Sequence, residues 1–284
     1  MMLKIRKRTA IVSIFLVLIV LLAIWIAWGN KALELNSHRI TSDKLPSSFD
    51  GFRIAQVSDL HNTEFGENNE KLLSMLREAN PDIIAITGDM IDLRNTKIEV
   101  ALKFAEQAVK IAPCYYISGN HEAYVDEYEE FKDSLTELGV VVLDDAKTEI
   151  ELSGEKITLV GVEDPSFSWT DNETLINDKL NELICEEDGY TILLSHRPEL
   201  FEIYVEKEVD LVFSGHAHGG QFRIPFVGGI VAPNQGLFPQ YDAGIYIEGK
   251  TTMVVSRGIG NSIFPFRVNN RPEVVLIELA FQEV

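Results

Sequence analysis

Short runs of apolar residues alternate with amphipathic segments through most of this chain. The runs are typical of buried strands, and the segments between them space their apolar residues as helices do. Strands are expected at 53–58, 83–87, 115–118, 140–143, 157–162, 191–195 and 210–214, and helices at 68–80, 96–111, 128–138 and 172–185. Beyond Gly219 the helical spacing ends, and short strands are expected at 252–256 and 273–277. Because such alternation is typical of βαβ units, we expect an α/β fold: a four-layer α/β/β/α sandwich of two mixed sheets.

The first thirty residues have a different pattern. Residues 10–28 carry no charge, and 19 helical residues at a rise of about 1.5 Å nearly span a hydrocarbon core. Four basic residues precede this stretch, which predicts a cytoplasmic N-terminus and an extracytoplasmic domain at the cell membrane. A cleaved signal peptide is the alternative, but the stretch ends in bulky residues such as Trp25 and Trp28. We therefore expect a single-pass transmembrane helix.

Three segments follow from these patterns. Residues 1–30 are expected to be a basic tail and anchor, 31–51 a polar, loop-like linker, and 52–284 one large domain. The part beyond the anchor holds 21 basic residues against 44 acidic ones, so nucleic acid is an unfavoured partner. Cys114 is expected to be a core residue. It forms no C-x-x-C pair with Cys185, so no disulfide framework is indicated.

Histidines and carboxylates gather where the expected strands end. Asp59 and His61 follow the first strand, and Asp89 follows the second. The other such residues are Asn120, His121, His196, His216 and His218. Carboxyl ends of parallel strands meet at one edge of a sheet, so we expect a metal site there. Imidazole and oxygen donors without thiolate favour Mn, Fe, Zn or Co over Ca.

Two divalent cations about 3.5–4 Å apart suit the hydrolysis of phosphate esters. Such ions lower the pKa of a bound water and stabilise charge on the phosphoryl oxygens. Two dications with two aspartates leave a positive centre that attracts an anionic phosphate in spite of the acidic surface.

The order of five blocks resembles the calcineurin-like metallophosphoesterase superfamily. The blocks are D-x-H at 59–61, G-D-x-x-D at 88–92, G-N-H-E at 119–122, the lone His196, and G-H-x-H at 215–218. The resemblance covers about 51–279. Segments 215–221, 236–239, 256–262 and 271–274 resemble its bacterial membrane-anchored or secreted branch.

The resemblance implies a role for each candidate residue. Asp59, His61 and His218 would hold one metal, Asp89 would bridge, and Asn120, His196 and His216 would complete the second site. His121 would donate a proton to the leaving oxygen. The implied protein is a membrane-anchored, dinuclear-metal phosphoesterase that hydrolyses phosphodiester, pyrophosphate or phosphomonoester bonds by attack of a metal-bound hydroxide.

Several alternatives stay open at this point. One is a nuclease of the same fold, and another is a non-catalytic, metal-containing binding module. The branch includes proteins labelled as cleaving nucleotide–lipid pyrophosphates. For a substrate of that kind, five phenylalanines of the C-terminal part would contact acyl chains, and the alternative is that they pack in the core. They are Phe222, Phe226, Phe238, Phe264 and Phe266. Asp92 and Glu122 suit either support of a ligand histidine or a local turn. Arg197, Arg223 and Arg257 suit either phosphate binding or a structural role.

Overall fold

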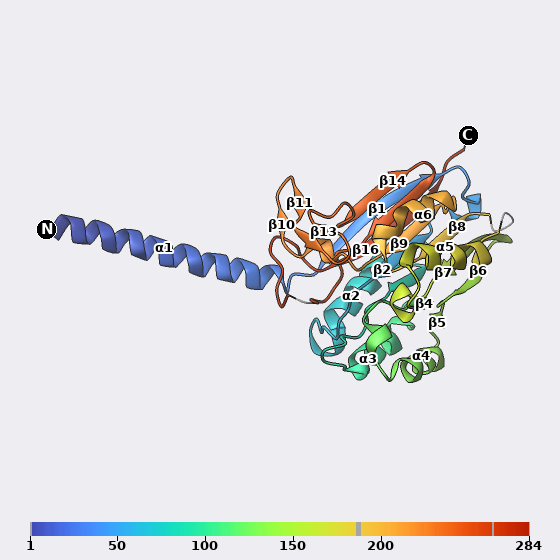
Figure 1. The fold of residues 1–284 in the computed structure, drawn as a ribbon, viewed down its shortest axis with the longest axis horizontal. Helices are drawn as coiled ribbons and strands as arrows, with labels where there is room; N and C mark the ends of the chain where they lie inside the picture. The colour runs from blue at the N-terminus through green and yellow to red at the C-terminus, as the bar shows by residue number, and fades with distance from the viewer. Residues whose placement is uncertain (1, 186–188, 263, 284) are drawn as a thin grey trace.

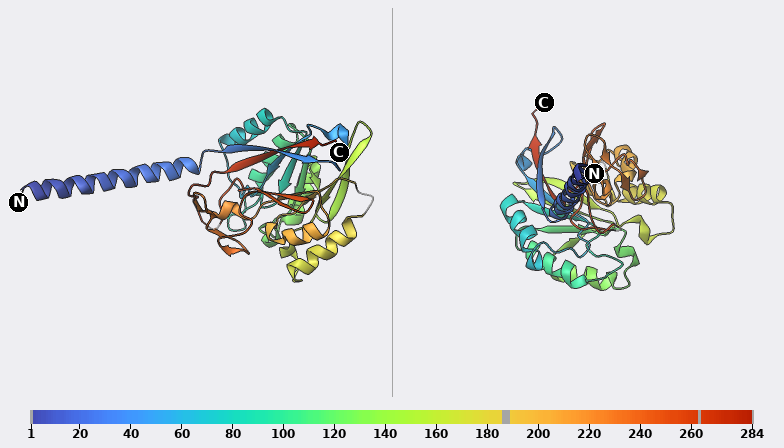
Figure 2. Two further views of the ribbon diagram at one scale, coloured as in Figure 1. Left: turned by 90° about the horizontal axis from the view of Figure 1, so that it is seen from above. Right: turned by 90° about the vertical axis from the view of Figure 1, so that its left-hand side faces the viewer.

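A single long helix projects from an α/β domain in the computed structural model, which describes residues 2–185, 189–262 and 264–283. The helix is α1 (Met2–Gly29). Its stretch Ala10–Gly29 is long and apolar enough to cross a membrane, and the domain buries none of it (Figures 1 and 2). A bare apolar helix of this kind is unfavourable in water.

The first sheet has six strands in the order β1-β16-β2-β3-β4-β5. Its strands are β1 (Glu34–Ser42), β2 (Arg53–Val57), β3 (Ile83–Thr87), β4 (Cys114–Ile117), β5 (Val141–Val142) and β16 (Glu273–Phe281). Strands β2 to β5 are parallel, whereas β16 runs antiparallel to β2. Helices α2 (Glu70–Ala79), α3 (Ile98–Ala108) and α4 (Tyr128–Glu137) pack against one face of this sheet.

The second sheet also has six strands, in the order β14-β15-β9-β8-β7-β6. Its strands are β6 (Ala146–Leu152), β7 (Glu155–Gly161), β8 (Thr191–Leu194), β9 (Leu211–Ser214), β14 (Gly244–Glu248) and β15 (Thr251–Val255). Helices α5 (Asn172–Leu183) and α6 (Phe201–Glu206) cover its outer face. The four-layer prediction is therefore confirmed.

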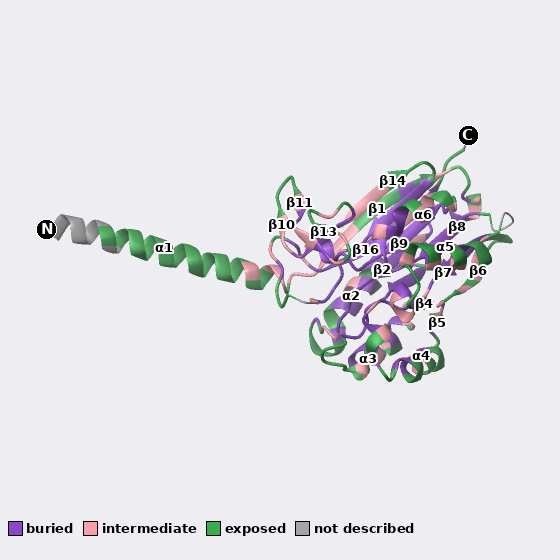
Figure 3. Ribbon diagram, viewed as in Figure 1, coloured by how far each residue is buried: buried purple, intermediate pink, exposed green. Residues whose placement is uncertain are grey.

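Side chains alternate between two layers of core along each buried strand, as the strand period of two requires. In β2, Ala55 packs under the α2–α4 helices while Ile54 packs against the second sheet. Ile192 and Phe213 of the second sheet meet Ile54 in this middle layer. Both faces of each central strand are buried, which explains their unbroken apolar runs. Figure 3 shows this buried interior.

The expected linker of 31–51 differs from the structure. Nine of its residues form β1, which pairs in parallel with β16 from Glu34 and Glu273 to Ser42 and Phe281. The loop prediction was wrong because β1 is an edge strand with mostly polar, partly exposed side chains, so it lacks the apolar run of a central strand. The polar strand β6 and the short helix α6 were missed for similar reasons.

Beyond β9 two small hairpins precede β14. The first joins β10 (Arg223–Ile224) to β11 (Gly228–Gly229), and the second joins β12 (Val231–Ala232) to β13 (Gly236–Leu237). Both lie at the end of the domain from which α1 leaves (Figures 1 and 2). No α-helix occurs among the described residues beyond α6, as the sequence pattern predicted.

Candidate metal centre

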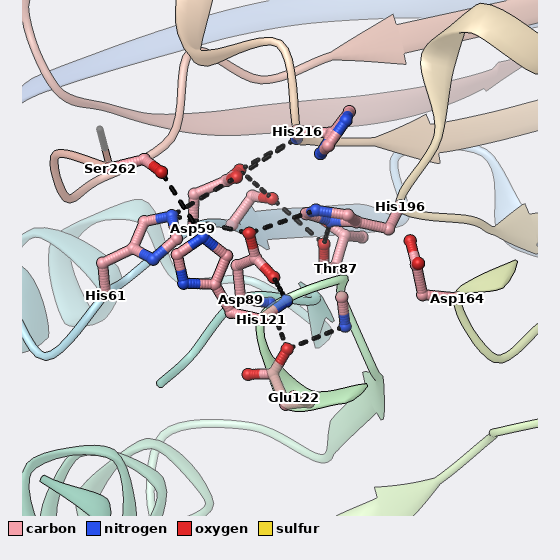
Figure 4. A network of polar contacts seen from close by, with 12 residues as sticks. Asp59, His61, Thr87, Asp89, His121, Glu122, Asp164, His196, His216 and Ser262 are labelled. Atoms are coloured by element: carbon pink, nitrogen blue, oxygen red, sulfur yellow. Dashed lines mark hydrogen bonds and ion pairs between the residues drawn. The ribbon is translucent and has the colours of Figure 1, made fainter. Parts of the chain in front are cut away.

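Candidate ligands from both sheets converge at the carboxyl ends of the central strands (Figure 4). One group brings together Asp59, His61, Asp89 and His218, with donor atoms all within 4.8 Å of one another. A second group, at the same limit, consists of Asp89, His196 and His216. Every member is buried, and Asp89 belongs to both groups. The structure thus places side by side residues that are up to 159 positions apart in the chain.

Asp89 occupies the middle of this cluster. Its Oδ2 lies 3.5 Å from Nε2 of His61 and 3.4 Å from Nε2 of His196. On the first side, Oδ1 of Asp59 lies 3.3 Å from Nε2 of His218, which is itself 3.1 Å from Nε2 of His61. One carboxylate therefore faces histidines on two sides, which is the arrangement that a bridging ligand needs.

Orphaned acceptor atoms show whether cations fit here. The Nδ1 of His196 lies 2.7 Å from the carbonyl oxygen of Thr87, so Nδ1 donates and Nε2 is the nitrogen free to bind a metal. That Nε2 is buried and makes no hydrogen bond among the described residues, although Oδ2 of Asp89 lies 3.4 Å away, and Oδ1 of Asn120 is likewise buried without a hydrogen bond. Buried acceptors without partners are costly, and a divalent cation would satisfy both. The residues present fit a metal site.

Burial shifts Asp59 and His61 toward their neutral forms, whereas the His196 ring beside Asp89 is shifted toward its charged form. Burial raises the pKa of Asp59 to about 6 and lowers the pKa of His61 to about 3. Burial opposes a charge on His196 too, yet Asp89 raises the pKa of that ring to about 10. The Asp89 position thus attracts a cation strongly enough to overcome desolvation, and a metal ion would take the place of that proton.

The backbone that carries these side chains is strained. Asp59, His61, Asp89, His216 and His218 have φ values of 53°, 44°, 52°, 64° and 48°. Non-glycine residues rarely adopt this left-handed region, and such strain gathers at functional sites. Five of the seven candidate ligands are held this way, so the surrounding fold aims them at one point at the expense of local stability.

Glu122 is a buried support of this backbone. Its carboxylate accepts from the backbone N–H groups of Asp89 at 3.0 Å, Ile91 at 3.1 Å and Gly119 at 2.9 Å. It therefore ties the loop after β3 to the loop after β4 (Figure 4). Its carboxylate accepts from backbone groups, and no hydrogen bond joins it to a histidine among the described residues, so it does not orient a ligand ring. Asp92 instead accepts from Arg94, through its backbone N–H and its guanidinium.

His121 has a defined orientation beside the cluster. The backbone N–H of Leu93 donates to its Nδ1 at 3.2 Å, so the proton of the neutral ring lies on Nε2. That Nε2 lies 3.4 Å from Oγ of Ser262, and both residues line the same cavity. The backbone N–H of His121 also donates to Oδ1 of Asp89 at 2.8 Å. The backbone of His121 is therefore tied to the candidate bridging carboxylate, and its Nε2 lies near Ser262.

A cavity of about 470 Å³ opens over these residues. Asp89, Asn120, His121, His216 and His218 line it, together with the cations Arg94 and Arg197. Arg197 is buried and makes two hydrogen bonds to Asp164, at 2.6 and 2.8 Å, while its Nη1 reaches Oδ1 of Asn234 at 2.9 Å. Asp164 was overlooked although it follows β7 at the same spacing as Asn120 follows β4, whereas Asn234 lies between β12 and β13 and follows no long buried strand.

The other two arginines considered from the sequence, Arg223 and Arg257, have structural partners. Arg223 donates to the carbonyl of Gly219 and to Asp242. Arg257 pairs with Glu34 and Glu273, and so links β1 to β16. Neither lines the cavity over the metal cluster, so of the three arginines considered from the sequence only Arg197 does.

The fold and this cluster define a metal-dependent phosphoesterase class. The family model for calcineurin-like phosphoesterases matches residues 52–220, and the chain belongs to that family. The enzymes of this family hydrolyse phosphoric esters, and the chain is such a hydrolase. The superfamily prediction is thereby confirmed.

Similar proteins include the uncharacterized metallophosphoesterase YkuE of Bacillus subtilis, 31% identical over 87% of this chain and 85% of that protein. Phosphodiesterase YaeI of Escherichia coli is 28% identical over 87% of this chain and 88% of its own length. A zebrafish transmembrane protein with metallophosphoesterase domain is 28% identical, and the match covers 84% of this chain but 56% of that protein. The solved structure of TT1561 from Thermus thermophilus shares the fold, with a TM-score of 0.52 at 15% identity over 73% of this chain and 90% of that one.

Proposed function

We propose that this protein is a membrane-anchored phosphodiesterase that works with two divalent cations. The observation that carries the proposal is the shared position of Asp89 between two groups of buried donor atoms. The name of the Escherichia coli relative supports a phosphodiester substrate. The apolar, unburied helix α1 supports the anchor, as does the name of the zebrafish relative.

Seven side chains would hold the two ions: Asp59, His61 and His218 on one side, Asn120, His196 and His216 on the other, and Asp89 between them. Such ions, when bound, supply a nucleophile at neutral pH and neutralise charge on the phosphoryl oxygens. Mn, Fe, Zn or Co suit this donor set.

The protein's own groups then act on the substrate. Arg197 lies at the cavity wall, where Asp164 and Asn234 hold its guanidinium in place, so it adds a fixed positive charge beside the position of an anionic phosphoryl group. His121 has Nε2 on the side of the cavity residue Ser262, so it is placed to donate a hydrogen bond or, as the imidazolium, a proton to the leaving oxygen. No covalent enzyme intermediate is needed.

An isosteric change at Asp89 tests the proposal. Asp89→Asn keeps the oxygen that accepts from the backbone of His121, so the fold is expected to persist. It removes the charge that two cations would share, so hydrolysis of bis(p-nitrophenyl) phosphate should fall at least ~100-fold and bound metal should drop. The matched control is His38→Gln, since His38 is exposed on β1. Full activity in Asp89→Asn would refute the proposal.

A further inference from the structure

An apolar surface lies beside the end of α1. Its members are Ile224, Phe226 and Val227 at the tip of the first hairpin, Leu237 and Phe238 at the second, and Phe264 and Phe266 in the following loop, and all are exposed. Phe226 is 109% exposed, so nothing in the domain covers its ring. None of the five phenylalanines considered from the sequence packs in the core: Phe222 is half-buried, and its ring contacts those of Phe264 and Phe266. Large exposed apolar groups that cluster mark an interaction surface.

Direct bonds hold this surface against the anchor. Asn30, just past the end of α1, donates from Nδ2 to the carbonyl of Arg267 at 2.9 Å and accepts at Oδ1 from the N–H of Arg267 at 2.7 Å. Arg267 is the neighbour of Phe266 in sequence. The guanidinium of Arg271 lies over the ring of Trp28, 5.2 Å from its centroid. The phenylalanine loop and the last turn of α1 are therefore fixed to one another.

The charge of the same segments is unlike that of the rest of the chain. The protein has 44 acidic residues, yet none lies between Asp210 and Asp242 or between Glu248 and Glu273. These two stretches contain the whole apolar surface, and their charged residues are all basic: Arg223, Lys250, Arg257, Arg267 and Arg271. Asp242, Glu34 and Glu273 pair with three of these arginines and Arg267 is buried, so it is the absence of free acids beside exposed aromatic rings that suits contact with a lipid surface.

We infer that the hairpin tips and the phenylalanine loop rest in the bilayer that α1 crosses, so that the domain meets the lipid in a fixed orientation. This inference rests on the proposed anchoring by α1. Its occupant is the lipid bilayer, because the surface adjoins the last turn of a helix that is bare and apolar. Trp25 and Trp28 at that turn are residues typical of the membrane interface.

Contact of these segments with the bilayer would fix the position of the cavity relative to the lipid head groups. Pro233 and Asn234, between β12 and β13, line the cavity over the metal cluster, and so does Ser262, next to the phenylalanine loop. The segments that touch lipid would thus also form one wall of the site. Substrate would then be captured at the level of the lipid head groups.

Spin labels in the full-length chain test the inference in vesicles of phosphatidylcholine and phosphatidylglycerol. Labels are placed through Phe226→Cys or Phe238→Cys, each combined with Cys185→Ser to remove the exposed native thiol. The control is Ile247→Cys, because Ile247 is apolar and 72% exposed but lies at the end of β14 that pairs with the start of β15, away from the cavity. Hydrolysis of bis(p-nitrophenyl) phosphate by each labelled protein confirms that it is folded.

Labels at 226 and 238 should collide more with oxygen, which dissolves in lipid, than with a water-soluble nickel chelate, and the label at 247 should show the reverse ratio. Nickel collisions at 226 and 238 equal to those at 247 would overturn the inference. If both reagents are excluded from the labels at 226 and 238, and if spin–spin coupling disappears when unlabelled chain is added, a second copy of the chain covers the surface. That result would overturn the inference. If alkaline washing releases the chain from the vesicles, the anchoring by α1 is contradicted. In that case the labels should collide with oxygen and with the nickel chelate equally often in the presence and absence of lipid.

Discussion

Replacing Glu122 with glutamine should loosen the loops that carry the candidate metal ligands. In the wild-type protein, Oε2 of Glu122 accepts from Asp89 and Gly119, and Oε1 accepts from Ile91. A glutamine can keep its oxygen at the Oε2 position, but its NH₂ group then faces the N–H of Ile91. One hydrogen bond is lost and a buried donor is left without an acceptor, at a cost of about 1–3 kcal/mol.

The expected loss of stability is large enough to measure. In a domain of this size each 1 kcal/mol shifts Tm by roughly 2–4 °C, so Glu122→Gln should lower Tm by about 2–12 °C. Glu122→Ala leaves three donors unpaired and should cost about 3–9 kcal/mol, a large part of the stability of a typical domain. The loss of activity should exceed the loss of folded protein that the lower Tm implies. The reason is that a small displacement of catalytic groups reduces rates by about 100-fold.

Differential scanning calorimetry and steady-state hydrolysis of bis(p-nitrophenyl) phosphate measure both effects. Glu137→Gln is the matched control, since Glu137 ends α4 and its side chain is exposed. The control should leave Tm and kcat unchanged. A Glu122→Gln protein with the Tm and kcat of the wild type would refute the argument that this carboxylate holds the two loops.

Three further predictions follow from the site and the core. His121→Gln should lower kcat about 10²–10⁴-fold for a diester with an alkoxide leaving group, less for one with p-nitrophenolate, and should leave metal content unchanged; equal losses for both substrates would exclude general-acid catalysis. Dialysis against a chelator should lower Tm, and added Mn²⁺ should restore it, because buried acceptors regain a partner; a Tm insensitive to chelator would contradict metal binding. Native protein should expose one thiol of two to iodoacetamide at pH 9, since burial raises the pKa of Cys114 to about 12 while Cys185 is exposed; two rapidly modified thiols would contradict that burial.

The ligand cluster could be predicted from the sequence because each residue follows an apolar run. Runs such as 83–87 can only be central strands, and the residue after a central parallel strand has a known place at the sheet edge. The expected strands alone therefore predict that Asp89 lies near Asp59. The two sheets and their covering helices followed from the same alternation.

Features that depend on tertiary contacts could not be predicted. The polar sequence of β1 has no periodicity that distinguishes it from a loop, and it becomes a strand because β16 offers a partner edge. The support that Glu122 gives to two loops depends on backbone groups, which carry no side-chain signal. The pairing of Arg197 with Asp164 joins positions 33 residues apart, and nothing in their spacing indicates it.

The central claim is that Asp89 lies between two cations. Crystals of the purified protein grown with Mn²⁺, measured at the manganese absorption edge, test it directly. Two anomalous peaks are expected, one beside Asp59, His61 and His218 and one beside Asn120, His196 and His216, with the Asp89 carboxylate in contact with both. A map with no peak among these side chains, or with a single peak that Asp89 does not contact, would contradict the account.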